Sequence, residues 1–175
     1  MSVAGFGDSN ALFKVYIGNR PSYKIENQTQ SIRPLKTREI YDIGQTCGNG
    51  WRKVFNVYAK LLYALTRGAI NGHYYQSWQQ YRDNALLQES SATALLFNAP
   101  DFTHANALHM IMGRTYANTL SLPPSLVWLN KEFAIDKSKR LIVCPYFDYR
   151  QLSNHKIIFL VDLIKQEFGL CLLEP

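Results

Sequence analysis

The stretch LFKVYIG at residues 12–18 is the clearest strand signal in the sequence. Apolar side chains surround a single lysine, and Gly18 ends the run, which is the pattern of a buried strand bounded by a turn residue. Other apolar runs of similar length predict strands along the rest of the chain, at 94–98, 126–129 and 141–145, with 170–173 as a further edge strand.

Segments with helical spacing alternate with these strands. Apolar residues recurring every three or four positions predict a helix that begins near Gly50 and stops at Gly68. The same spacing predicts helices over 75–87, 105–116 and 157–168, and either Asp101 or Thr103 is a candidate cap for the second of these. Residues 19–45 are polar and interrupted by prolines, which predicts a long loop carrying a basic stretch at 33–38.

Strands that alternate with helices imply right-handed crossovers between parallel strands. We therefore expect an α/β fold in three layers: a mostly parallel sheet of four to five strands with helices on both faces. The sequence contains no repeat and no interdomain linker, so residues 1–175 are expected to form a single domain.

The composition is that of a globular protein, with 47% hydrophobic and 18% charged residues. The start of the chain lacks the pattern of a signal peptide, and no apolar run approaches the ~20 residues that span a bilayer, so we expect a cytoplasmic protein without membrane contact. The three cysteines are far apart and are interpreted as free thiols. A net charge of +6 favours anionic partners such as phosphates or nucleic acid, although many basic proteins bind neither.

The strong catalytic signatures are missing from the sequence. It contains no phosphate-binding loop, no nucleophile elbow and no zinc-binding helix. His104 and His109 are five residues apart, which on a helix would place them on different faces. Cys47 beside two glycines is more simply an inert cysteine than a reactive one. We therefore expect no metal site and no cofactor, and we identify no catalytic residue.

Ligands of open α/β sheets bind outside the carboxyl ends of the strands. Three segments that follow apolar runs are rich in polar and aromatic side chains and contain a proline. The candidate ligand-binding residues are Asn19, Arg20 and Ser22 in the first, Asn98, Asp101 and His104 in the second, and Tyr146, Asp148, Tyr149 and Arg150 in the third. The arginines suit phosphate or carboxylate and the tyrosines offer stacking faces, but each residue is equally explained as a cap or turn residue.

The order of these segments resembles the uracil-DNA glycosylase superfamily. Its motifs are matched by Gly18-Asn19-Arg20-Pro21-Ser22, by the helix from Gly50 to Leu61, by Leu95-Leu96-Phe97-Asn98 and by Cys144-Pro145-Tyr146-Phe147. The motifs are short and degenerate, and the same layout is equally typical of an uncharacterised bacterial family that shares only the order of elements. The resemblance implies that Asn98 reads a flipped base by hydrogen bonds to its edge.

The resemblance also implies a loss of chemistry. The position of the water-activating aspartate is Arg20, and the position of the last-loop histidine is Cys144. A guanidinium cannot act as a general base, because its pKa lies above ~12. We therefore expect a nucleic-acid-binding or nucleotide-binding protein without ordinary uracil excision. Two alternatives stay open: a small-molecule enzyme that uses Asp148 or Asp101 as acid or base, and a non-catalytic interaction domain that docks a partner through residues 19–45. The oligomeric state is not indicated by the sequence.

Overall fold

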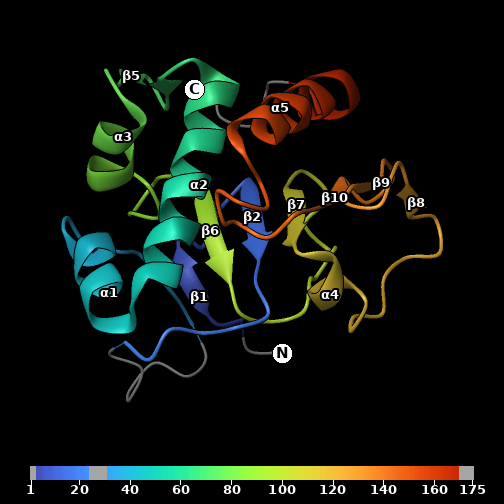
Figure 1. The fold of residues 1–175 in the computed structure, drawn as a ribbon, viewed down its shortest axis with the longest axis horizontal. Helices are drawn as coiled ribbons and strands as arrows, with labels where there is room; N and C mark the ends of the chain where they lie inside the picture. Colours follow the sequence, from blue (N-terminus) through green and yellow to red (C-terminus); the bar gives the residue numbers. More distant parts are fainter. Residues whose placement is uncertain (1–2, 24–30, 170–175) are drawn as a thin grey trace.

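The computed structural model describes residues 3–23 and 31–169 and shows an α/β fold built on one large mixed sheet (Figure 1). The eight strands of this sheet lie in the order β3-β1-β6-β2-β7-β10-β9-β8, and a separate hairpin pairs β4 with β5. The strands are β1 (Gly5–Gly7), β2 (Phe13–Tyr16), β3 (Ile32–Arg33), β4 (Ala69–Ile70), β5 (His73–Tyr74), β6 (Thr93–Leu96), β7 (Leu108–Met112), β8 (Val127–Trp128), β9 (Ala134–Asp136) and β10 (Leu141–Cys144).

The centre of the sheet is parallel, and its margins are mixed. The strand β2 pairs in parallel with β6 on one side and with β7 on the other, and β7 pairs in parallel with β10. The pairs β1–β6, β9–β10 and β8–β9 are antiparallel, while β1–β3 is parallel. The expected count of four to five strands is wrong, because β1, β3, β8 and β9 are only two or three residues long and add strands at both margins.

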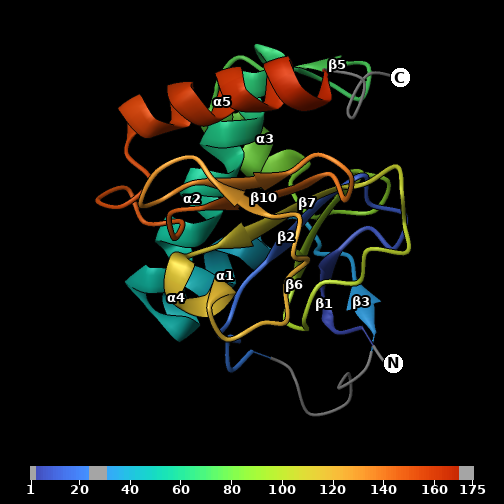
Figure 2. The same cartoon turned by 90° about the vertical axis from the view of Figure 1, so that its right-hand side faces the viewer.

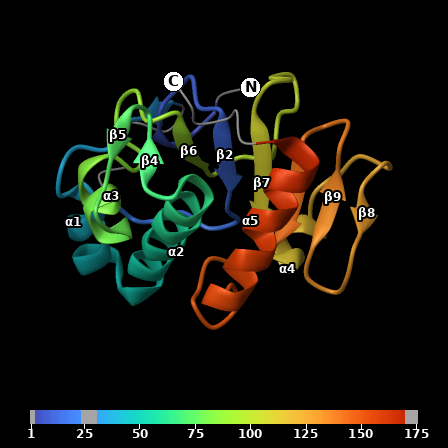
Figure 3. The same cartoon turned by 90° about the horizontal axis from the view of Figure 1, so that it is seen from above.

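The helices are α1 (Glu39–Cys47), α2 (Asn49–Thr66), α3 (Trp78–Asn84), α4 (Arg114–Ala117) and α5 (Asn154–Phe168). Viewed from above, α1, α2, α3 and α5 lie on one side of the sheet (Figure 3), and all four contribute to the larger of two hydrophobic clusters. On the opposite face the smaller cluster takes in Ala117 of α4 together with loop residues such as Phe102 and Leu122. The second layer expected there consists of one short helix and loops.

The predicted helix over 105–116 is wrong. Leu108–Met112 forms β7, all five residues are buried, and only Arg114–Ala117 is helical. Leu108, Met110 and Met112 belong to the larger cluster and Ile111 to the smaller one, so both faces of the run are buried and no alternation of apolar and polar residues separates strand from helix. Asp101 therefore caps no helix; its carboxylate instead accepts a hydrogen bond from the backbone N–H of Thr103 at 3.0 Å.

The predicted loop over 19–45 is wrong in part, because it contains β3 and most of α1. Ile40 and Ile43 bury the inner face of α1, and Glu39 accepts hydrogen bonds from Arg33 and from the backbone N–H of Lys36, both at 2.8 Å. Residues 24–30 of this segment and the edge strand expected at 170–173 lie outside the described residues.

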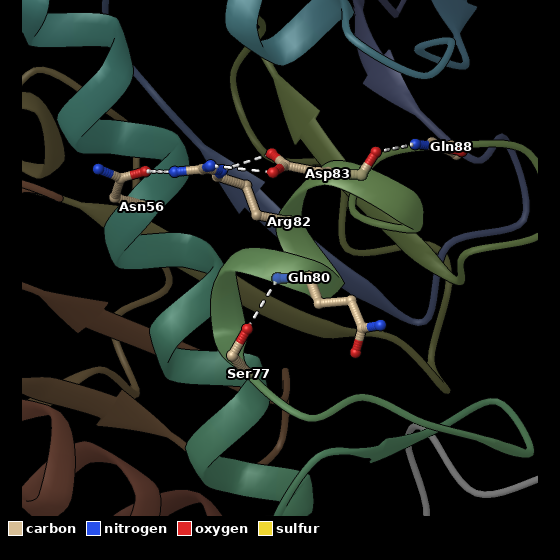
Figure 4. Close-up of polar contacts among 6 residues, drawn as sticks. All are labelled: Asn56, Ser77, Gln80, Arg82, Asp83 and Gln88. Carbon is tan, nitrogen blue, oxygen red and sulfur yellow. Dashed lines mark hydrogen bonds and ion pairs between the residues drawn. The ribbon is translucent and has the colours of Figure 1, made fainter.

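The other predicted strands and helices are present with shifted ends. The helix expected over 75–87 is shorter: α3 covers Trp78–Asn84, with Ser77 accepting a hydrogen bond from the N–H of Gln80 (Figure 4). Arg82 fastens α3 to α2 through the side chain of Asn56 at 2.6 Å, and it also pairs with Asp83. The predicted helix that begins near Gly50 is α2, which buries nine side chains. The residue that follows it, Arg67, has the left-handed backbone conformation.

Loops and the short helix α4 cover the face of the sheet opposite the long helices (Figure 2), and Tyr16 is buried in the smaller cluster on that face. The hydroxyl of Tyr16 and Nδ1 of His109 are 2.8 Å apart, and Phe102 packs edge-on against the imidazole. Lys14, the cross-strand neighbour of His109, is 6% exposed. Burial is the main cause that lowers the pKa of His109 to about 4, so the imidazole is neutral in the folded protein.

No helix in the described part of the chain is both long and apolar enough to cross a membrane.

The neutral state of His109 makes a prediction about acid stability. Below pH ~6.5 an unfolded chain protonates this imidazole whereas the folded one does not until pH about 4, so the free energy of unfolding falls with pH across that window. At about 1.4 kcal/mol per pH unit the full loss is about 3 kcal/mol. Urea unfolding of wild type and His109→Gln at pH 7 and pH 4.5 measures it. The variant should lose most of this slope, whereas the same change at His155, which is exposed on α5, should keep it. Equal slopes in all three proteins would contradict the assignment.

Candidate functional site

A cavity of about 520 Å³ opens at the carboxyl ends of three neighbouring parallel strands. Its lining begins where β2, β7 and β10 end and continues onto α4 and the segment before β9, at the edge of the sheet where α4 lies (Figure 1). The lining residues are Gly18, Asn19, Met112, Gly113, Arg114, Thr115, Tyr116, Thr119, Lys131, Glu132, Pro145, Tyr146 and Gln151.

This edge is the place where the topology of the sheet leaves a crevice. From β2 the chain runs through the helices to β6 on one side, whereas from β7 it runs to β10 on the other side. The connections that leave β2 and β7 thus diverge, and ligands of open α/β sheets bind at such a switch point. The expectation of a site at strand carboxyl ends is consistent with this position.

One wall of the pocket is formed by residues that follow β2 and β10. The hydroxyl of Tyr146 donates a hydrogen bond to the side-chain oxygen of Asn19 at 3.2 Å. The ring of Tyr146 lies beside Gly113, where an added Cβ would be at ordinary contact distance of 3.8 Å. Partial burial raises the pKa of Tyr146, so the phenol is protonated at neutral pH and is a donor.

Arg114 supplies a fixed positive charge to the lining. Its guanidinium carbon lies 4.4 Å from the centre of the Trp128 ring, and Nη1 donates to the backbone oxygen of Lys131 at 2.7 Å. A guanidinium carries five N–H donors, and within the described residues this one makes no further hydrogen bond. The group is therefore held in place with donors still available.

The charges of the lining are unequal. Arg114 and Lys131 contribute cations, and Glu132 is the one acidic residue among the lining residues. Its carboxylate is paired with Nζ of Lys156 at 2.6 Å. The pocket therefore presents net positive charge, which suits an anionic ligand.

Of the three candidate residues of the first loop, one lines the pocket. Asn19 lines the pocket. Arg20 is exposed, and its guanidinium carbon lies 5.3 Å from the centre of the Phe97 ring, beyond the pocket lining. Ser22 is exposed, and its backbone N–H interacts with the thiol of Cys47.

The candidate residues of the second segment do not line the pocket. The side-chain oxygen of Asn98 accepts a hydrogen bond from the backbone N–H of Ala4, and its backbone oxygen accepts one from the hydroxyl of Tyr116 at 3.5 Å. Asp101 and His104 are exposed on the connection to β7. The hydrogen bonds of the Thr103 backbone and side chain lower the pKa of Asp101.

The third loop divides into two parts. Tyr146 lines the pocket, while Asp148, Tyr149 and Arg150 form a turn beside it. Asp148 accepts from the backbone N–H of Arg150 at 2.9 Å and pairs with Nζ of Lys53 at 3.1 Å. The hydrogen bond from the Arg150 backbone and the pairing with Lys53 hold the pKa of Asp148 below its usual value.

Most of the lining was missed by the sequence reasoning. The segment from Gly113 to Thr119 follows β7, and the helix predicted over 105–116 runs across this strand end and hides it. The signal was present: Gly113 has a φ of +96°, and a glycine that directly follows an apolar run marks a strand end. Lys131 and Glu132 precede β9, a three-residue strand that the sequence did not reveal.

The described residues contain no group of three or more histidine, cysteine, aspartate or glutamate side chains placed to hold a metal ion. In comparisons with known proteins, residues 4–165 match a family described as Family of unknown function (DUF6942). No curated protein and no solved structure matches the chain.

The close approach at Gly18 makes a prediction about the pocket wall. A Cβ there would lie 2.8 Å from Cδ2 of Tyr116, so Gly18→Ala forces the ring to move and should cost about 1–3 kcal/mol in the free energy of unfolding. Gly50 of α2 is the matched control: a Cβ there meets nothing within 4 Å, and Gly50→Ala should stabilise by about 0.5–1 kcal/mol. Thermal or urea unfolding measures both, and a Gly18→Ala protein as stable as wild type would contradict the packing.

Proposed function

We propose a ligand for the pocket of this chain, which belongs to the DUF6942 family of unknown function. The pocket binds a phosphate-bearing ligand, which is either a free nucleotide or one nucleotide of a nucleic acid. One observation carries the proposal: a single cavity is lined by two cationic residues, Arg114 and Lys131, and by two phenol rings, Tyr116 and Tyr146. Cations bind phosphate oxygens, and aromatic rings stack on bases.

The geometry of Arg114 supports phosphate as the anionic part of the ligand. The Trp128 ring and the Lys131 carbonyl fix the guanidinium, so little rotamer entropy is lost when it binds. The remaining donors suit the oxygens of a phosphate or carboxylate. Asn19 and Gln151, which also line the cavity, supply the amide groups that could read the edge of a base.

Uracil excision is not part of the proposal. The residue at the position of the water-activating aspartate is Arg20, whose guanidinium packs on Phe97. The side-chain oxygen of Asn98, expected to read a base, accepts instead from the backbone of Ala4. The lining of the described cavity offers one carboxylate, Glu132, and that group is paired with Lys156.

The two alternatives receive less support. A general acid at neutral pH needs a raised pKa, whereas hydrogen bonds lower the pKa of both Asp148 and Asp101. An interaction domain would dock its partner through residues 19–45. Most of α1 belongs to this segment and packs on α2, and residues 24–30 lie outside the described part of the chain.

Arg114→Ala should weaken binding of a fluorescent adenine mononucleotide by about 1–3 kcal/mol, because a charge-assisted hydrogen bond to phosphate is lost. Lys131→Ala should act in the same direction. The matched control is Lys139→Ala, which removes one exposed charge at the amino end of β10, the opposite edge of the sheet. Fluorescence anisotropy at low and at physiological salt measures all four proteins. Equal affinity of Arg114→Ala and Lys139→Ala, or no binding by wild type, would contradict the proposal.

The protein should release no uracil from a uracil-containing single strand under conditions in which it binds that strand. The reason is that no described lining residue is free to activate water as a general base. Separation of free base from the strand after prolonged incubation measures this, with an active glycosylase as positive control. Release of uracil that stops in the Asn98→Ala variant would show that the resemblance extends to chemistry.

A further inference from the structure

The turn that follows Tyr146 is held rigidly. Phe147 and Leu152, at its two ends, are completely buried. Between them Asp148 accepts hydrogen bonds at its backbone oxygen from the N–H groups of Gln151 and Leu152, both at 2.8 Å, and at its carboxylate from the N–H of Arg150. These hydrogen bonds and the two buried ends stabilise the backbone of the turn in the absence of a ligand.

This rigid turn presents an aromatic ring to solvent. Tyr149 is 55% exposed. Nζ of Lys53 lies 5.1 Å from the centre of its ring, and the guanidinium carbon of Arg150 lies 5.7 Å from it. Asp148 pairs with both cations, which fixes their positions relative to the ring. We name the set of Lys53, Tyr149 and Arg150 the platform.

The platform is continuous with the pocket. Tyr146 and Gln151, which line the cavity, flank Tyr149 in the same turn. Since consecutive Cα atoms are ~3.8 Å apart, the Cα of Tyr149 lies within ~7.6 Å of the Cα of Gln151. A chain that leaves the pocket on this side reaches the platform within one or two nucleotides, because stacked nucleotides advance by ~3.4 Å each.

We propose that the ligand of the pocket is single-stranded nucleic acid, and that the platform binds the nucleotide next to the one in the pocket. The ring of Tyr149 and the guanidinium plane of Arg150 stack on a base. Lys53 and Arg150 share one carboxylate, Asp148, so one net positive charge remains to bind the adjoining phosphate. Stacking on an aromatic ring is tolerant of sequence, and cations beside the ring follow the backbone. The inference rests on the proposed function of the pocket.

Rigidity and exposure together favour this ligand. A preordered turn loses little conformational entropy when a base stacks on it. A mononucleotide confined to the pocket would leave the platform unused, so the contribution of the platform is measured by the difference between a short strand and a mononucleotide.

The experiment compares a labelled adenine mononucleotide with a labelled six-nucleotide single strand, both by fluorescence anisotropy. Wild type should bind the strand at least about 10-fold more tightly, and Tyr149→Ala should weaken strand binding by about 5- to 100-fold while leaving mononucleotide binding unchanged. Tyr149→Phe should bind the strand as wild type does, because it keeps the ring. The matched control is Tyr41→Ala on α1: Tyr41 is 56% exposed and has Arg38 over its ring at 5.7 Å, but it is remote from the pocket lining.

The outcomes separate the two proposals. If the mononucleotide binds and Tyr149→Ala behaves like Tyr41→Ala toward the strand, the platform is overturned and the pocket stands. If the strand binds in a Tyr149-dependent way and the mononucleotide does not bind, the pocket as a nucleotide site falls, and the placement of the platform next to a nucleotide in the pocket falls with it. If wild type binds neither probe, both are overturned.

Discussion

The parallel pairing of β2 with two neighbours at once is the constraint on which the rest of the structure depends. Side chains of a strand alternate between faces, so a slip of one residue would exchange Phe13 and Val15 with Lys14 and Tyr16. Phe13 and Val15 pack under the long helices, whereas Lys14 and Tyr16 face the loops of the other side. Burial of the apolar pair therefore fixes the register, and the register fixes which strand ends meet at the pocket.

The face away from the long helices has a different composition because loops cover it. Loop residues such as Phe102 and Leu122 pack on this face, and a polar pair beneath them is satisfied locally, as the contact of Tyr16 with His109 shows. The edge of Phe102 covers the imidazole, and Tyr116 reaches over the end of β2 because Gly18 has no side chain. Phe102, before β7, thus covers His109, and Tyr116, after β7, lines the cavity.

The sequence was informative where a segment had one hydrophobic face or clear ends. The central strands β2, β6 and β10 and the helices α2 and α5 were predicted, because their apolar residues are bounded by glycine or by polar turns. The strand β7 was not, since Leu108, Met112 and Tyr116 recur at helical spacing across its end, and a run with both faces buried has no period of its own to oppose that reading. That one error removed Gly113 and Arg114 from the expected site. Asn19 and Tyr146 were found because each follows a strand that was recognised.

The electrostatics of the pocket give the strongest reason to regard it as a binding site. Arg114 is exposed, so water solvates its charge and the fold needs no carboxylate beside it. Arg114 is fixed by a ring and by a carbonyl, neither of which carries a negative charge, and the nearby carboxylate of Glu132 is already paired with Lys156. By contrast, the cation Arg33 elsewhere in the fold is paired directly with Glu39. The free donors of Arg114 therefore face solvent at the cavity wall, where the oxygens of an anionic ligand can replace water.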